Sequence, residues 1–522
     1  MNFLASGNRA EVSSASGAPG QTTVWLEEAL FGHRLWPRQT PWLLFLEFMN
    51  VLEGFHQQDP TAVLTPRPPD ALSPYKMRYR LGLRAILFSN DEMERIAAAS
   101  EHSQRQWTEW LGTMEGLGAG TDFSYLRERF TSFRDFAELV GLVRQTTLEN
   151  ESNRRSSSRF IFPFGVDALF SDATYNEKNG AITADFNNFG RTGEILYMMA
   201  SRAARGGELR PFFAELLDPT QPKNKLIARL SAPGDDELNR EQKGETYLPY
   251  REHPAFERLV EDWLAIFSLG LPEQDAFAHL VPIGALHVVL YQLETAAALS
   301  GWPVRPALIC ELIAPKREFV RQRSIISYQE NDTLALRALD AAIDRFECDP
   351  EWLALLADDT SDQDRSDRAA ELIKQRFRVR DRGGRGALPH DQIAALRREV
   401  EDKHEVTGGR VHSSYLRQIG LASSRATNRM RYAPNDTLLK TLVITRVAER
   451  REFRQFLADL YEHYGLVFGE TEAKRALSAI EFDASAFERN RERLEGRLAS
   501  MGLVQRLSDG CAYVINPFTR ER

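Results

Sequence analysis

Hydrophobic positions recur at helical spacing through most of this chain. Apolar side chains three and four residues apart predict a helical N-terminal domain over residues 24–150, with breaks at Pro37 and Pro41. A longer apolar run covers residues 279–301 and also contains two histidines, a glutamine and a glutamate. That mixture favours a helix buried inside a folded protein over one that spans a membrane.

The pattern changes after residue 150 and predicts a mixed α/β domain over residues 151–330. Asn179 and Gly180 stand between two short β-like runs, which is a strong local signal for a hairpin. A helix is expected to begin near Arg191 and to end at Gly206 and Gly207. The run VRPALICELIAP, residues 304–315, is expected to form a buried strand.

Three further segments complete the expected organisation. Residues 331–373 return to a helical pattern, residues 374–433 are predicted to be a basic arm or linker, and residues 434–522 are predicted to fold as a compact unit. Residues 1–23 are rich in Gly, Ser and Ala and are expected to form a flexible tail. The predicted fold class is therefore multidomain and predominantly α, with a mixed α/β middle region.

The last segment contains a helix followed by a hairpin. An inward stripe is predicted on the helix 484–501, which Asp483 or Ser485 can cap and Gly502 ends. The stretch LASMGLVQRLSDGCAYVINPF, residues 498–518, then gives two short strands around a Ser-Asp-Gly turn. This order of elements resembles the winged-helix superfamily and implies a C-terminal winged-helix domain. The stripe comprises Phe487, Asn490, Leu494, Leu498 and Met501.

Charge is distributed unevenly along the chain. The net charge is −8, yet residues 374–432 hold 14 Lys or Arg against 6 Asp or Glu, a local net charge of +8. Arginine suits phosphate geometrically, so the basic segment and the winged helix together are expected to contact DNA. The predicted DNA-binding residues are Arg376, Arg378, Arg380, Arg425, Arg429, Arg431, Arg489, Arg491, Arg493 and Arg506.

A protein-docking role for the winged helix stays open at this stage. Residues 446–522 hold 13 basic and 13 acidic residues, and Glu488, Glu492 and Glu495 lie among the arginines of the long helix. Such charges also form solvated pairs on a helix surface. The sequence therefore supports DNA contact mainly through the basic segment that precedes the module.

Signatures of catalysis are weak. The motifs GxxxxGK[ST], HExxH and GxSxG are absent, and three scattered cysteines indicate neither a zinc site nor a disulfide framework, so no cofactor and no metal are expected. A metal-dependent nuclease that uses Asp185, Glu311 and Lys316 is an alternative. In FGRTGE, Arg191 and Glu194 are expected to form a structural clasp at a helix start.

The stretches FGRTGEILYMMASR and LSDGCAYVINPF give the whole chain a resemblance to accessory proteins of bacterial multi-gene anti-phage defence systems. The resemblance implies a non-catalytic subunit beside a separately encoded motor, nuclease or protease. We therefore expect a cytoplasmic adaptor that contacts DNA and partner proteins and has no membrane association. The alternatives are the nuclease and a purely structural subunit whose winged helix docks protein.

Overall fold

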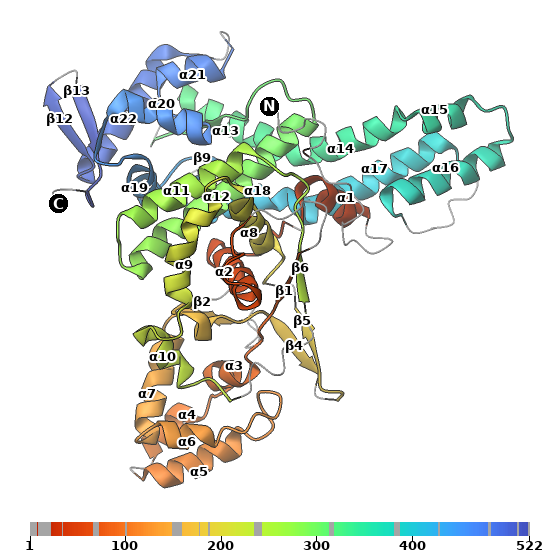
Figure 1. Ribbon diagram of the computed structural model, residues 1–522. Coiled ribbons are helices and arrows are strands. Elements are labelled where there is room, and N and C mark those ends of the chain that lie inside the picture. The colour runs from red at the N-terminus through yellow and green to blue at the C-terminus, as the bar shows by residue number, and fades with distance from the viewer. Residues whose placement is uncertain are drawn as a thin grey trace.

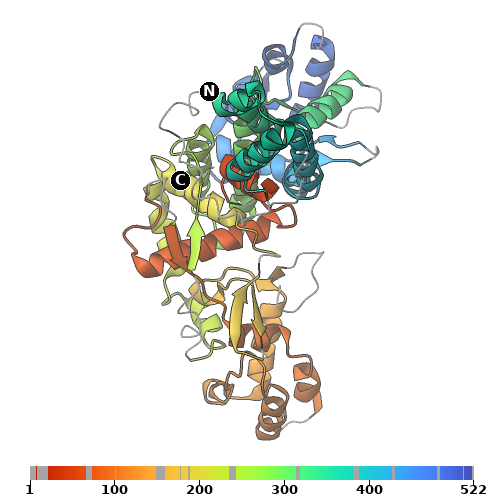
Figure 2. The ribbon, with the colours of Figure 1, turned by 90° about the vertical axis from the view of Figure 1, so that its right-hand side faces the viewer.

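The computed structural model is built mainly from helices, with small sheets at their edges (Figure 1). It describes residues 8, 22–33, 35–65, 73–99, 102–148, 159–176, 178–185, 188–233, 243–312, 318–379, 387–425, 429–478, 482–508 and 511–519. A lobe, an arm and a C-terminal module surround a set of central helices. The lobe lies at the lower end of the molecule in both Figure 1 and Figure 2, and the other two parts lie at the upper end.

The central helices are α2 (Pro41–Gln58), α8 (Thr192–Arg202), α11 (Pro254–Ser268) and α12 (Glu273–Leu299). Thr40 caps α2, since its side chain accepts a hydrogen bond from the Leu43 N–H. Among the described residues, α12 alone is long and apolar enough to cross a membrane, and 89% of its apolar window is buried inside the fold. The prediction of a buried helix over 279–301 is thereby confirmed.

The lobe is a helical cluster around packed aromatic side chains. Its helices are α3 (Leu81–Phe88), α4 (Met93–Ala99), α5 (Ser103–Thr113), α6 (Tyr125–Arg129) and α7 (Phe133–Arg144). Trp107, Trp110, Phe133 and Phe136 contact one another edge to face or at a tilt. Helices α9 (Arg210–Leu217) and α10 (Pro222–Ala228) lie between the lobe and the central helices. The short helix η4 (Val166–Ala168) packs against α10, and η5 (Gly206–Leu209) packs against α8, α9 and α11.

Three two-stranded antiparallel sheets accompany these helices. They are β1 (Ser73–Lys76) with β6 (Lys243–Thr246), β2 (Thr147–Leu148) with β3 (Phe160–Ile161), and β4 (Ala173–Asn176) with β5 (Ala181–Ala184). The β4–β5 pair is the hairpin predicted at Asn179 and Gly180, and Gly180 has the positive φ that its turn requires. The helix expected near Arg191 is α8, which ends at Arg202 before the two glycines.

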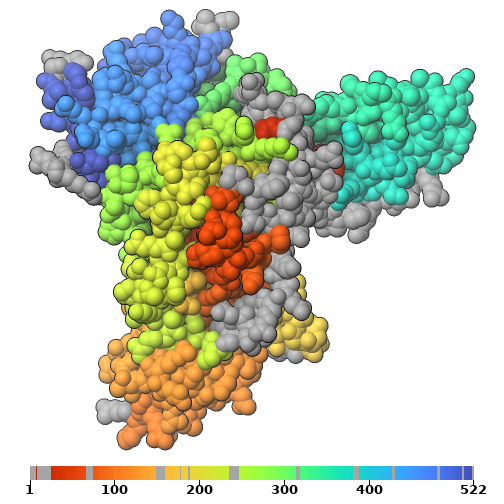
Figure 3. Space-filling model, in the orientation of Figure 1, coloured from red at the N-terminus to blue at the C-terminus, as the bar shows by residue number. Residues whose placement is uncertain are grey.

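The arm comprises α14 (Leu334–Glu347), α15 (Pro350–Ala357), α16 (Asp362–Phe377) and α17 (Pro389–Val406). It projects to one side of the molecule, and α1 (Thr22–Phe31) packs against α14, α16 and α17 at its base (Figure 3). The expected basic arm over 374–433 instead contains the end of α16, all of α17, the short helix η6 (Gly408–Arg410) and α18 (Val411–Gln418). Most of that segment is thus packed helix, with buried Ile393, Leu396 and Val400 on one face of α17.

The C-terminal module comprises residues 436–519. Its helices are α19 (Asp436–Arg446), α20 (Phe453–Tyr464), α21 (Glu470–Ala476) and α22 (Ala484–Ser500). Its antiparallel sheet has the order β10-β13-β12, with β10 (Arg450–Glu452), β13 (Cys511–Ile515) and β12 (Val504–Ser508). Asp483 caps α22, and Gly502 has a φ of +72° just after the helix, as the sequence predicted.

One strand pairing attaches the module to the rest of the chain, and a second lies just before the module. Strand β11 (Leu466–Val467) is parallel to β7 (Leu308–Ile309), and β8 (Ala422–Ser423) pairs with β9 (Arg431–Tyr432). Helix α13 (Phe319–Asp332) packs against β7, β9 and α22. One continuous hydrophobic core therefore runs from Trp25 in α1 to Val514 in β13.

Candidate functional site

The buried face of α22 carries Asn490, whose side chain is hydrogen-bonded to three backbone groups. The Asn490 amide donates to the carbonyl oxygens of Cys310 at 3.0 Å and Phe468 at 2.8 Å, and its oxygen accepts from the Leu312 N–H at 2.9 Å. Phe487, Leu494 and Leu498 are buried on the same face. The opposite face is exposed, and it presents Glu488, Arg489, Glu492 and Gly496.

The ten arginines predicted to contact DNA do not share one surface. Four lie on α22 or β12, two lie at the end of α16, three lie at the β8–β9 connection, and one lies outside the described residues. In that order they are Arg489, Arg491, Arg493 and Arg506; Arg376 and Arg378; Arg425, Arg429 and Arg431; and Arg380. Figure 1 places α16 in the arm and α22 in the module, at opposite sides of the molecule.

Each of the four module arginines has a carboxylate partner. Arg493 lies 2.8 Å and Arg489 3.7 Å from the Glu318 carboxylate. Arg491 pairs with Glu470 at 3.1 Å, and its side chain is only 13% exposed. Arg506 pairs with Glu495 at 2.7 Å but is 66% exposed, and Arg489 is 52% exposed. Of these four, Arg489 and Arg506 are therefore the arginines that solvent, or a phosphate, reaches most easily.

Arg431 has a structural role. Its side chain is buried, and its Nε donates to the Glu311 carboxylate at 2.5 Å while an Nη donates to the Ser423 carbonyl. A charge buried in this way is held by its partner and is removed from any ligand outside the protein. Arg431 is therefore not accessible to a DNA phosphate, whereas Arg376, Arg425 and Arg429 are exposed.

The residues of the nuclease alternative also lie apart. Asp185 follows β5, whereas Glu311 follows β7 and its N–H donates to Tyr432 in β9. Figure 1 shows β5 and β9 in different parts of the molecule, and Lys316 lies outside the described residues. A two-carboxylate metal site that joins Asp185 and Glu311 is not formed by this arrangement.

Asp185 instead lines a small cavity with three other carboxylates, those of Glu47, Asp172 and Glu194. The cavity has a volume of about 10 Å³, which is room for one water molecule. Burial raises the pKa of Glu47 to about 7 and that of Asp172 to about 7. No short sequence motif predicts this cluster, because its members come from α2, α8, the residue after β5 and the segment before β4.

The start of α8 holds the cluster in place. Arg191 has a φ of +69°, and its Nε donates to Glu194 at 2.8 Å, which confirms the predicted clasp. Glu47 accepts hydrogen bonds from the backbone N–H groups of Arg191 and Gly193 at the helix N-terminus. Tyr75 donates to Glu194 at 2.8 Å. Because Glu47 and Glu194 are saturated by internal donors, the cluster is best explained as a structural network.

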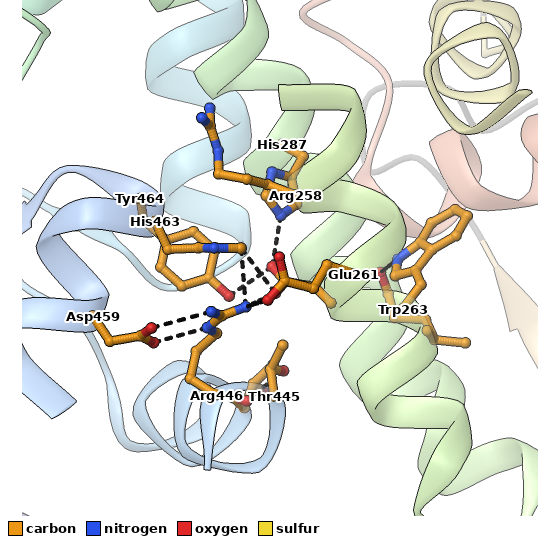
Figure 4. Close-up of polar contacts among 12 residues, drawn as sticks. Arg258, Glu261, Trp263, His287, Thr445, Arg446, Asp459, His463 and Tyr464 are labelled. Atoms are coloured by element: carbon orange, nitrogen blue, oxygen red, sulfur yellow. Dashed lines mark hydrogen bonds and ion pairs between the residues drawn. The ribbon is translucent and has the colours of Figure 1, made fainter. Parts of the chain in front are cut away.

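A second buried cluster joins the C-terminal module to the central helices (Figure 4). Asp262 of α11 accepts hydrogen bonds from His287 at 2.7 Å and Tyr464 at 2.7 Å, and it pairs with His463 and Arg446, both at 2.9 Å. These donors hold the pKa of Asp262 well below its ordinary value despite complete burial.

The ligand atoms of Asp262, His287 and His463 lie within 4.8 Å of one another, a spacing that suits a metal ion. The Arg446 guanidinium, however, lies 2.9 Å from the carboxylate and 3.3 Å from the His463 ring nitrogen. A divalent cation at this place would meet that positive charge at close range. The residues present therefore do not fit a metal ion, and the cluster serves to attach the module.

Comparisons with protein-family models, curated proteins and solved structures find no match for this chain.

Proposed function

We propose that this chain is a non-catalytic adaptor subunit of a cytoplasmic multi-protein assembly, as in anti-phage defence. Its C-terminal module contacts DNA, and its body contacts partner proteins. The observation that supports the proposal is the order of elements in the module: helices α19 to α22 lead into the β12–β13 hairpin, and β10 joins the same sheet. This order resembles that of a winged helix, in which the helix before the wing would be the one to enter the major groove.

Only arginines that are exposed can belong to the proposed contact surface. An exposed ion pair is worth about 0–1 kcal/mol, so a DNA phosphate can displace the carboxylate from a side chain such as Arg506 or Arg489. Arg491 is too enclosed for that exchange, since its side chain is 13% exposed. The proposed DNA surface therefore consists of Arg489 on α22 and Arg506 on β12, with Arg425 and Arg429 as outlying contacts.

Duplex binding by the full chain tests this surface. We expect the Arg489→Ala/Arg506→Ala variant to bind more weakly than wild type, with a slope of log affinity against log salt that is shallower by about 1–2. The measurement is fluorescence anisotropy with one labelled duplex at two salt concentrations. DNA contact by this surface is excluded if wild type and variant give the same affinity and the same slope.

A matched control removes two other exposed arginines. Arg134 and Arg205 are 80% and 54% exposed, and each pairs with a glutamate three or four residues away on the same stretch of chain. The Arg134→Ala/Arg205→Ala variant changes the net charge equally but lies outside the module. Its duplex affinity is expected to match that of wild type.

Protein docking by the module is the second candidate, and one observation favours it. Arg491, Arg493, Arg497 and Arg506 pair with carboxylates of the same chain, whereas the exposed apolar side chains Leu507 and Phe518 lie on or beside the hairpin. If wild type fails to bind duplex even at the lower salt concentration, docking replaces DNA contact as the explanation of the winged helix.

A further inference from the structure

Helix α15 of the arm is apolar on both faces. Trp352 and Leu355 point inward and are buried, while Leu353 is 51% and Leu356 is 45% exposed. The alanines beside them, Ala354 and Ala357, are exposed as well. A helix that is hydrophobic all round is normally buried on all sides, so the outer face of α15 has the character of a contact surface.

A groove of about 500 Å³ lies at the base of the same arm, between α1 and the ends of α14 and α16. Its floor is apolar and includes Trp25, Leu30 and Phe346. Three arginines line it, Arg345, Arg376 and Arg378, and the described residues that line it include no carboxylate. The groove therefore suits a segment whose inserted side chains are apolar and whose flanking side chains are acidic.

A second hollow, of about 170 Å³, connects the groove to α15. It shares Phe346, Gln375 and Arg376 with the groove and is also lined by Asp349, Glu351 and Trp352 at the start of α15, where Asp349 lies 3.6 Å from Arg376. The groove and the N-terminal end of α15 are consequently parts of one surface. Figure 3 shows that the arm carrying α15 projects away from the rest of the molecule.

The two ends of this surface have opposite charge. Residues 349–368, which form α15, the following loop and the start of α16, hold seven Asp or Glu and two Arg, a net charge of −5. Asp359 and Glu351 among them are exposed. The groove carries the arginines. One arm thus contains both an apolar helix in acidic surroundings and an apolar groove with a basic rim.

We propose that two copies of this chain pair arm to arm in antiparallel orientation, with α15 of each copy in the groove of the other. A two-fold axis brings the same two patches together twice, which is the geometry of a self-complementary interface. Leu353 and Leu356 then leave water, and the acidic flanks of α15 face Arg345 and Arg376 of the partner copy. The pairing does not depend on DNA contact by the C-terminal module.

Sedimentation equilibrium of the DNA-free full chain tests the proposal. We expect a concentration-dependent dimer that weakens as salt is added, since oppositely charged surfaces are screened. The Leu353→Glu/Leu356→Glu variant should associate at least about 100-fold more weakly, as expected when two central apolar anchors are lost. The Leu142→Glu/Leu226→Glu variant alters leucines that are 58% and 45% exposed elsewhere, and it should dimerise like wild type.

A charge swap tests the antiparallel arrangement itself. The Arg345→Glu/Arg376→Glu variant and the Glu351→Lys/Asp359→Lys variant should each associate about tenfold or more weakly than wild type. All four substitutions in one chain should restore association, because the tip is then basic and the groove acidic. A wild type that stays monomeric, a dimer that the leucine variant leaves intact, or a fourfold variant without recovery would overturn the proposal.

Discussion

His253 and His287 are buried histidines that remain uncharged. The Nδ1 of His253 accepts a hydrogen bond from the Ala255 N–H and caps α11. Burial lowers the pKa of His253 to about 3 and that of His287 to about 4. A histidine whose pKa is lower in the folded than in the unfolded state favours folding above about pH 6.5. That contribution is lost as the pH falls toward the folded-state pKa.

The His253→Asn variant isolates this contribution. Asparagine can keep the cap but does not titrate. When the pH is lowered from 7.5 to 5, the free energy of unfolding should therefore fall by about 2 kcal/mol less in the variant than in wild type. Comparison with the variant is needed because Glu47 and Asp172, with raised pKa values, act in the opposite direction over this range. Urea unfolding at both pH values measures the difference. Equal losses in the two proteins would contradict the prediction.

At the scale of elements, α22 shows how one side chain positions a helix. Asn490 makes three hydrogen bonds to backbone groups of two other segments, the one after β7 and the one after β11. All three backbone groups lose their partner if the amide is replaced by a hydrocarbon. A buried polar group without a partner costs about 1–3 kcal/mol.

The Asn490→Leu variant should therefore lower the free energy of unfolding by about 3 kcal/mol or more, although leucine is the more hydrophobic residue. Urea unfolding gives the free energy, and limited proteolysis shows whether the C-terminal module is released first. Ser500→Leu, at an exposed position of the same helix, is the control and should change stability little. A stable Asn490→Leu variant would show that the three hydrogen bonds do not hold α22.

At the scale of the whole molecule, the Asp262 cluster makes the C-terminal module and the central helices one structure. Arg446 of α19 contacts Asp262 and Glu261 of α11, and it also contacts Asp459 of α20. Its side chain is only 10% exposed. Removal of one partner from a buried pair typically costs 3–5 kcal/mol, because the other charge is left uncompensated.

The Arg446→Met variant should accordingly be destabilised by about 3 kcal/mol, with faster amide hydrogen exchange in both α11 and α20. Faster exchange in both α11 and α20 would indicate that the attachment is lost, whereas a local defect would be confined to α19. Arg134→Met, at an 80% exposed position, should change stability by about 0.5 kcal/mol or less. Faster exchange in α20 alone would contradict a shared role of the cluster.

Local features of the fold were predicted well because their causes lie within a few residues. The Asn179–Gly180 turn, the Asp483 cap and the buried stripe on α22 each depend on neighbours along the chain. Residues 374–433 were predicted as a basic arm or linker from their arginines, and the structure forms helices over much of that segment. The spacing of Ile393, Leu396 and Val400 was a helical signal that could have revealed α17.

The sequence alone determined the helices, the hairpins and the uneven distribution of charge, since each follows from residue type and spacing. The tertiary structure decided which charged side chains are exposed to solvent and which are held by a buried partner. Glu311 and Arg431 are 120 positions apart, and Arg493 and Glu318 are 175 apart, so only folding could bring each pair together. The energy with which a charged side chain interacts depends on its partner and its burial, and neither can be deduced from the order of residues.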